Sequence, residues 1–212
     1  MKYIFVTGAP GSKWSSVVKN IYYSKSIDNS DYSEERTYHH DASGNMQLMH
    51  LGAYYDPGME FGDFFDKIDC HDKVTCEKEF DRPFNGQGTR IIKSHVFSYN
   101  IDYLLQTWRD VPIVLVHRDN DSCLGWWVRC GHFNITYPSY DSYYVDLTKM
   151  GKLINDQNRY MKEAWNKYEG KEVSDNIELC DTLGLQHPSA SEIYRQNYEK
   201  NNIKVKVINY AK

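Results

Sequence analysis

The sequence lacks the features that mark several specialised classes of protein. No apolar run approaches the roughly 18 residues of a membrane-spanning helix, and no basic N-terminal region precedes an apolar core and a cleavage site. Lysine and arginine number 25 against 29 acidic residues, a net charge of −4, which argues against a generic nucleic-acid binder. The five cysteines include no C-x-x-C pair and favour reduced thiols. We expect a soluble, cytoplasmic protein without a membrane span or a nucleic-acid partner.

Alternating apolar patterns indicate the fold class. With 212 residues and no linker-like run, the chain is expected to form a single domain over residues 1–212. Apolar runs alternate with helical stripes, and such alternation predicts an α/β fold in which helices flank a parallel sheet on both faces. Strands are expected at 2–7, 89–94, 112–117 and 203–208, and helices at 14–22, 101–108, 122–129, 147–168 and 189–200. Alternating lysines in the last strand predict that one of its faces meets water.

A glycine-rich stretch, T-G-A-P-G-S-K-W-S-S, joins the first strand to the first helix. Its glycines permit tight turns, and the N–H groups that begin the helix favour an anion. Lys13 would add a positive charge, and Ser12, Ser15 and Ser16 would add hydroxyl donors. The stretch thus predicts a phosphate site, although a serine-capped turn explains it too. Trp14 follows Lys13 where an ordinary nucleotide kinase has the hydroxyl that binds magnesium.

Polar clusters also end two other expected strands, those at 89–94 and 112–117. Lys93-Ser94-His95 ends the second, and His117-Arg118-Asp119 ends the third. Because the carboxyl ends of parallel strands lie at one edge of the sheet, these clusters are expected to converge with the glycine loop on a single ligand.

These motifs resemble those of the sulfotransferases that use 3′-phosphoadenosine 5′-phosphosulfate (PAPS), a family with a P-loop-like, three-layer α/β/α fold. Pro10-Gly-Ser-Lys-Trp-Ser-Ser16 is similar to the family's 5′-phosphosulfate loop, although Gly11 stands where that loop has a basic residue. Lys93-Ser94-His95 matches its lysine, hydroxyl residue and catalytic histidine. Arg118 matches the arginine of its 3′-phosphate site, whereas the accompanying serine is replaced by Trp126, and the nearest hydroxyl is that of Ser122.

The resemblance extends to roughly Cys130 and implies transfer of a sulfuryl group from PAPS to a hydroxyl or amine, with no metal required. His95 would be the base, and Lys13 and Lys93 would stabilise charge on the transferred group. Trp14 or Trp126 would stack on adenine. The acceptor could be a small molecule, a sugar or a peptide, and the oligomeric state is open. An ATP-dependent kinase and a catalytically silent nucleotide-binding protein are the alternatives. The residues expected to bind the nucleotide are Pro10, Gly11, Ser12, Lys13, Trp14, Ser15, Ser16, Arg118 and Ser122.

Overall fold

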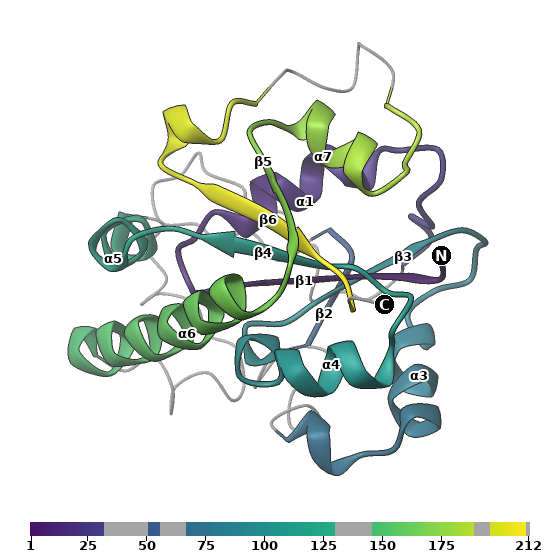
Figure 1. Cartoon of the computed structure of the whole chain (residues 1–212), viewed down its shortest axis with the longest axis horizontal. Coiled ribbons are helices and arrows are strands. Elements are labelled where there is room, and N and C mark those ends of the chain that lie inside the picture. The colour runs from purple at the N-terminus through teal and green to yellow at the C-terminus, as the bar shows by residue number, and fades with distance from the viewer. Residues whose placement is uncertain (32–50, 56–66, 130–145, 189–195, 211–212) are drawn as a thin grey trace.

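The strand expected from the first apolar run, β1 (Tyr3–Gly8), lies inside a six-stranded mixed sheet (Figure 1). The computed structural model describes residues 1–31, 51–55, 67–129, 146–188 and 196–210. The strands are ordered β2-β3-β1-β4-β6-β5, and the first four run parallel. The other five are β2 (Ala53–Tyr54), β3 (Arg90–Lys93), β4 (Ile113–His117), β5 (Gly170–Val173) and β6 (Lys204–Ile208).

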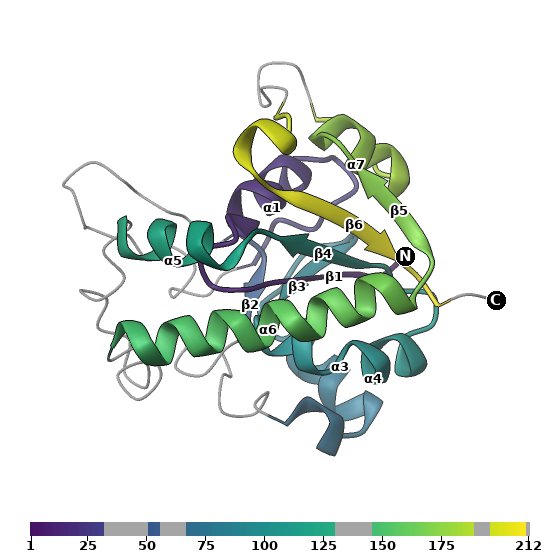
Figure 2. The same ribbon diagram turned by 60° about the vertical axis from the view of Figure 1, so that its left-hand side comes forward.

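Helices cover both faces of this sheet, as Figures 1 and 2 show. One face packs against α1 (Trp14–Tyr22) and α7 (Asn176–Thr182), and the other against α3 (Lys73–Asp81) and α4 (Ile101–Thr107). Both layers of the core include residues of α6 (Leu147–Lys167), whereas those of α5 (Asn120–Arg129) belong to the first. The 3₁₀ turns are η2 (Ile68–Cys70), η3 (Val96–Tyr99) and η6 (Glu199–Asn201).

Alternation of side chains along β1 explains why it supports two separate core layers. Ile4 and Val6 face α1, while Tyr3 and Phe5 face α3 and α4, and all four are at most 1% exposed. Successive strand residues point to opposite faces, so a strand that is apolar at every position is covered on both sides. Of the helices in the described residues, none is long and apolar enough to cross a membrane.

Three expectations about the C-terminal part need correction. The sheet is not parallel throughout, because β6 pairs antiparallel with both β4 and β5. The helix expected at 189–200 is wrong for residues 196–200, which carry an isolated bridge and the start of η6, while 189–195 lie outside the described residues. The expectation that the alternating lysines of the last strand face water is wrong for Lys206, which is only 9% exposed. Its Nζ donates to the carbonyls of Trp165 and Tyr168, at the C-terminal end of α6, where helix carbonyls favour a cation.

An ion network joins α3 to β1 and β3 at the edge away from the glycine loop. Asp81 accepts hydrogen bonds from Lys2 Nζ at 2.8 Å and from Tyr3 Oη at 2.7 Å, and its other partner is Arg90 Nη1. Burial alone would raise the pKa of Asp81, but these donors outweigh it and hold the pKa below its usual value. Stability from this carboxylate is therefore present above the usual aspartate pKa and is lost as pH falls through the lowered one.

Replacing Asp81 by asparagine removes that charge and retains the size of the side chain. At pH 7 we expect Asp81→Asn to lower the unfolding free energy by about 1–2 kcal/mol, after allowing for partial exposure. The deficit should shrink below about pH 4, where the unmutated carboxylate also becomes protonated. Urea unfolding at several pH values measures this, and the control is Asp110→Asn, at an exposed position that forms no ion pair with another described residue. A deficit independent of pH would contradict the electrostatic explanation.

Candidate functional site

The candidate site lies where the chain leaves adjacent strands β1 and β3 toward opposite faces of the sheet. After β1 it enters α1, on one face, and after β3 it enters η3 and α4, on the other. Divergence of this kind opens a crevice at the carboxyl ends of parallel strands, where α/β proteins bind ligands. Across this point His95, which follows β3, places its Nδ1 against the carbonyl oxygen of Gly8, the last residue of β1.

The glycine loop begins with a type II turn that its sequence dictates. Ser12 N donates to the Ala9 carbonyl at 3.0 Å, with Pro10 and Gly11 as the two central residues. Gly11 has φ 80°, as the second central residue of this turn requires. A Cβ on Gly11 would lie 2.0 Å from the carbonyl oxygen of Cys123 in α5. Only glycine therefore combines this conformation with such close packing.

Lys13 joins the turn to α1 in a conformation that side chains rarely adopt. Its φ of 63° and ψ of 23° are left-handed, which costs about 1–2 kcal/mol for a residue with a Cβ. Its Nζ lies 4.4 Å from the ring centroid of Trp126 in α5. Backbone strain of this type often accompanies a functional site, and the nearby ring holds the lysine side chain over α5.

The three serines of the loop differ in their surroundings. Ser12 is fully buried, and its Oγ has no hydrogen-bond partner among the described residues. Ser16 Oγ donates to the Lys13 carbonyl at 2.7 Å and accepts from Gln196 Nε2 at 3.2 Å. Ser15 is partly exposed at the start of α1. The hydroxyl of Ser16 thus supports the strained lysine backbone, whereas those of Ser12 and Ser15 make no such contact with other described residues.

The rings of His95, Trp14 and Tyr54 form a cluster, and the ammonium of Lys93 lies beside it. The rings of His95 and Trp14 stack at 3.9 Å between centroids, and Tyr54 meets both edge-on. Lys93 is fully buried, with its Nζ 5.8 Å from the Trp14 ring and 5.6 Å from the Tyr54 ring. This range suits cation–π attraction. The structure therefore brings two of the expected catalytic residues together around Trp14, whose ring stacks on histidine.

Arg118 connects the loop to α5. Its Nη1 donates to the carbonyls of Gly11 at 3.3 Å and Ser122 at 3.0 Å, whereas its buried Nε has no partner among the described residues. The Ser122 hydroxyl is 3.1 Å from Asn202 Nδ2, and its backbone N–H donates to Asp119. Both residues expected at a 3′-phosphate thus lie at the loop, but their recorded contacts join segments of the protein.

The charges around α5 have clear physical causes. The backbone N–H of Ser122 and its side chain hold the pKa of Asp119 below its usual value, so this carboxylate stays ionised. Burial raises the pKa of the Cys123 thiol to about 12, and a neutral thiol is a poor nucleophile at pH 7. Burial also lowers the pKa of His117, and the nearby Lys204 and Lys162 lower it further. His117 is therefore uncharged at neutral pH.

Sequence reasoning missed two residues that touch this site. Tyr54 belongs to β2, a two-residue strand too short to show a periodic pattern. Gln196 binds Ser16 and also accepts from Asn20 of α1 through its Oε1. No motif in the sequence indicates that a residue from the C-terminal part reaches the glycine loop.

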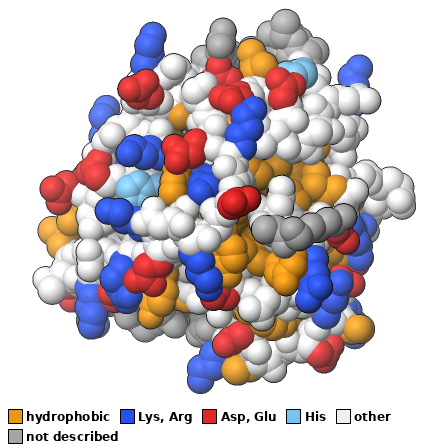
Figure 3. Space-filling view, in the orientation of Figure 1, with side chains coloured by type: hydrophobic (Ala, Val, Ile, Leu, Met, Phe, Trp, Pro, Cys, Tyr) orange, Lys and Arg blue, Asp and Glu red, His pale blue; other side chains and the backbone are white. Residues whose placement is uncertain are grey.

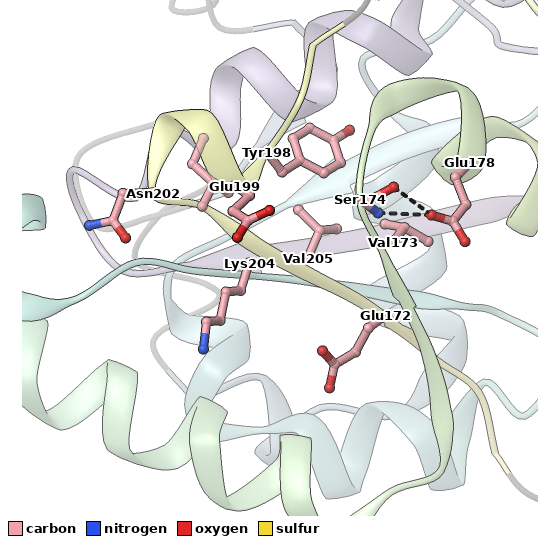
Figure 4. Close-up of a pocket in the computed structure, with 10 residues that line it drawn as sticks. Glu172, Val173, Ser174, Glu178, Tyr198, Glu199, Asn202, Lys204 and Val205 are labelled. Carbon is pink, nitrogen blue, oxygen red and sulfur yellow. Dashed lines mark hydrogen bonds between the residues drawn. The ribbon is translucent and has the colours of Figure 1, made fainter.

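Two hollows lie outside this cluster. One, of about 320 Å³, opens between β5, β6 and η6, and Figure 4 shows Ser174 hydrogen-bonded to Glu178 at its rim. The other, of about 500 Å³, lies beside α6 at the end of β4. In the described parts of the chain, no group of three or more histidine, cysteine or acidic residues could hold a metal ion.

Comparison with known proteins adds no relative: the sequence matches no family model, and neither curated proteins nor solved structures yield a significant match.

Proposed function

We propose that this protein transfers a sulfuryl group from PAPS to an acceptor hydroxyl or amine. The contact between His95 Nδ1 and the Gly8 carbonyl is the observation that most supports this proposal. A carbonyl oxygen can only accept, so the ring donates through Nδ1–H, and in the neutral imidazole the lone pair is on Nε2. This tautomer lets Nε2 accept a proton beside the glycine loop.

The buried polar atoms around the loop fit a nucleotide with several phosphate oxygens. Ser12 Oγ and Arg118 Nε are buried donors without a partner among the described residues. Leaving such groups unsatisfied costs about 1–3 kcal/mol each. Phosphate oxygens would accept from both, and the start of α1 together with Lys13 would favour the negative charge.

In the proposed reaction, His95 Nε2 takes the proton from the hydroxyl or amine of the acceptor. The oxygen or nitrogen of the acceptor then forms a bond to the sulfur of PAPS. The bond from sulfur to the 5′-phosphate oxygen breaks, and 3′,5′-bisphosphoadenosine leaves with that electron pair. Lys93 and Lys13 would stabilise the charge that develops on the transferred group and on the bridging oxygen. The P-loop-like character of the fold, the cosubstrate and the cytoplasmic location belong to the same proposal.

A catalytically silent nucleotide-binding protein is the second candidate. Arg118 Nη1 already donates to two backbone carbonyls, and His95 is only 6% exposed, both of which favour a structural role. An ATP-dependent kinase has less support, because the residue after Lys13 is the buried Trp14 and supplies no magnesium ligand.

Thermal unfolding with added nucleotide tests the proposal. A ligand that binds only the folded state stabilises it by about 2.7 kcal/mol at a hundred times its Kd, and each kcal/mol raises Tm by about 2–4 °C at this size. We expect 3′,5′-bisphosphoadenosine to raise Tm by roughly 5–11 °C in EDTA. ATP with magnesium should do little. Lys13→Gly, which keeps the left-handed backbone and removes the ammonium, should reduce the shift.

The matched control is Lys25→Gly, at an exposed lysine outside the loop, which should leave the shift unchanged. A shift only with ATP and magnesium would favour the kinase. If neither nucleotide changes Tm at millimolar concentration, nucleotide binding at this loop is refuted. A shift without PAPS turnover would favour the silent binding protein.

A further inference from the structure

The hollow beside α6 is a groove lined by residues of polar or charged type, whose aliphatic portions also contribute to its surface. Nine side chains line it, none of them apolar and four of them asparagines. Its volume of about 500 Å³ lies within the range of small-molecule sites, roughly 300–1,000 Å³. Its lining residues come from the end of β4, α5 and α6, which lie together at the left of Figure 1, and blue, red and pale-blue side chains gather at the left of Figure 3. A ligand would therefore find hydrogen-bonding groups in this groove, together with aliphatic surface from the same side chains.

Three of the asparagines form an ordered chain of amides. Asn158 Nδ2 donates to the Arg118 carbonyl at 2.9 Å and to Asn120 Oδ1 at 2.7 Å, and Asn120 Nδ2 donates to Asn155 Oδ1 at 3.0 Å. Asn158 is only 4% exposed, and its Oδ1 has no hydrogen-bond partner in the described part of the chain. The contacts orient the amides of Asn120 and Asn155, which are exposed, and Asn158 holds them from beneath, so the groove presents oriented amide groups.

The charges of the groove nearly cancel. Arg159 Nη1 pairs with Glu163 Oε1 at 3.1 Å, and its guanidinium lies 4.3 Å from the Tyr160 ring centroid, so two contacts orient it. The positive charge of Lys162 is balanced by the ionised Asp119, and His117 is uncharged at neutral pH. A strongly anionic ligand would meet two carboxylates, and a cation would meet Lys162 and Arg159.

From this arrangement we propose that the groove binds a neutral, polyhydroxylated ligand of the saccharide class. A hydroxyl both donates and accepts, as does each amide and each guanidinium–carboxylate pair of the lining. This proposal is independent of the proposed nucleotide site. Asn158 of the groove contacts the carbonyl of Arg118, whereas the side chain of Arg118 contacts the glycine loop.

Saturation-transfer NMR on the full chain tests this with glucose, galactose, mannose, N-acetylglucosamine and myo-inositol, and with phosphate and citrate as anionic probes. At least one neutral compound should bind without being displaced by 3′,5′-bisphosphoadenosine. Asn155→Ala should weaken that binding about fivefold, and Arg159→Ala about tenfold or more. Both residues lie at the surface of α6, so the variants should fold, and Asn29→Ala, at an exposed asparagine elsewhere, should bind normally.

Four results would overturn the proposal. The first is that none of the neutral compounds binds, and the second is that binding is unchanged in both groove variants. The third is that phosphate or citrate binds and Arg159→Ala abolishes that binding, which would make the groove an anion site. Displacement by 3′,5′-bisphosphoadenosine would place the saccharide at the glycine loop instead and would refute a separate site. Each outcome leaves the nucleotide thermal shift as an independent result.

Discussion

Gly11→Ala is expected to destabilise the protein by about 2–5 kcal/mol. The left-handed backbone accounts for about 1–2 kcal/mol, and forcing a methyl group into a packed contact adds about 1–3 kcal/mol. The second term arises because the new Cβ would lie 2.0 Å from the Cys123 carbonyl oxygen. Thermal unfolding should show a Tm lower by roughly 4–20 °C. The change should also weaken binding of 3′,5′-bisphosphoadenosine, because the loop and α5 would have to separate.

Substitutions at two other glycines distinguish the cost of the left-handed backbone from the cost of packing the methyl group. Gly184 has φ 65°, and no atom of another described residue lies within 4 Å of the position that a Cβ would take there, so Gly184→Ala should show only the backbone cost of about 1–2 kcal/mol. Gly125 lies within α5 with equally open surroundings, and Gly125→Ala should stabilise by about 0.5–1 kcal/mol. If Gly11→Ala melts no lower than Gly184→Ala, the packing of the loop against α5 is wrong.

The sequence predicts the elements whose stability is local or whose burial is complete. Runs such as Tyr3–Gly8 and Ile113–His117 are apolar enough to be buried on both faces, and α6 shows a helical stripe along its length. By contrast, β2 has two residues, and three of the four residues of β5 are exposed. These two strands form because a partner strand supplies their hydrogen bonds. A local sequence pattern cannot predict pairing with a strand that is distant in sequence.

Strand direction depends on the same non-local information. The run 203–208 predicts a strand, but its antiparallel pairing with β4 follows from where α7 and η6 return the chain. The burial of Lys206 likewise depends on the end of α6 lying over β6. Alternation of residue types predicts two faces, but it does not reveal that the carbonyls of another element solvate a lysine.

For the candidate site, the sequence predicts which strand ends come together but not how side chains are used. The meeting of the glycine loop with His95 and Arg118 follows from strand order and parallel direction. The sequence also predicts the tight turn at Pro10 and Gly11. The sequence does not predict that Arg118 donates to backbone carbonyls or that Trp14 stacks on His95. Both contacts depend on side-chain rotamers that are set by packing against other elements.

His95→Asn is expected to lower turnover by roughly 10²–10⁴ if the proposed sulfuryl transfer is correct, the usual contribution of a general base. Asparagine retains an N–H donor toward the Gly8 carbonyl, so the contact between the ends of β1 and β3 can persist. Release of 3′,5′-bisphosphoadenosine from PAPS, measured with a mixture of hydroxyl and amine acceptors, gives the rate. The thermal shift with 3′,5′-bisphosphoadenosine should change little, because the base acts on the acceptor.

The control for this variant is His187→Asn, at an exposed histidine paired with Asp181 and remote from the loop in sequence. It should leave turnover unchanged. The pH dependence of turnover adds a readout that a merely structural histidine would not move, since the acidic limb of kcat/KM should disappear in His95→Asn. Folded His95→Asn protein with normal turnover would remove His95 from the mechanism. Loss of turnover together with a loss of the nucleotide thermal shift would instead assign His95 the structural task of holding β1, β3 and Trp14 together.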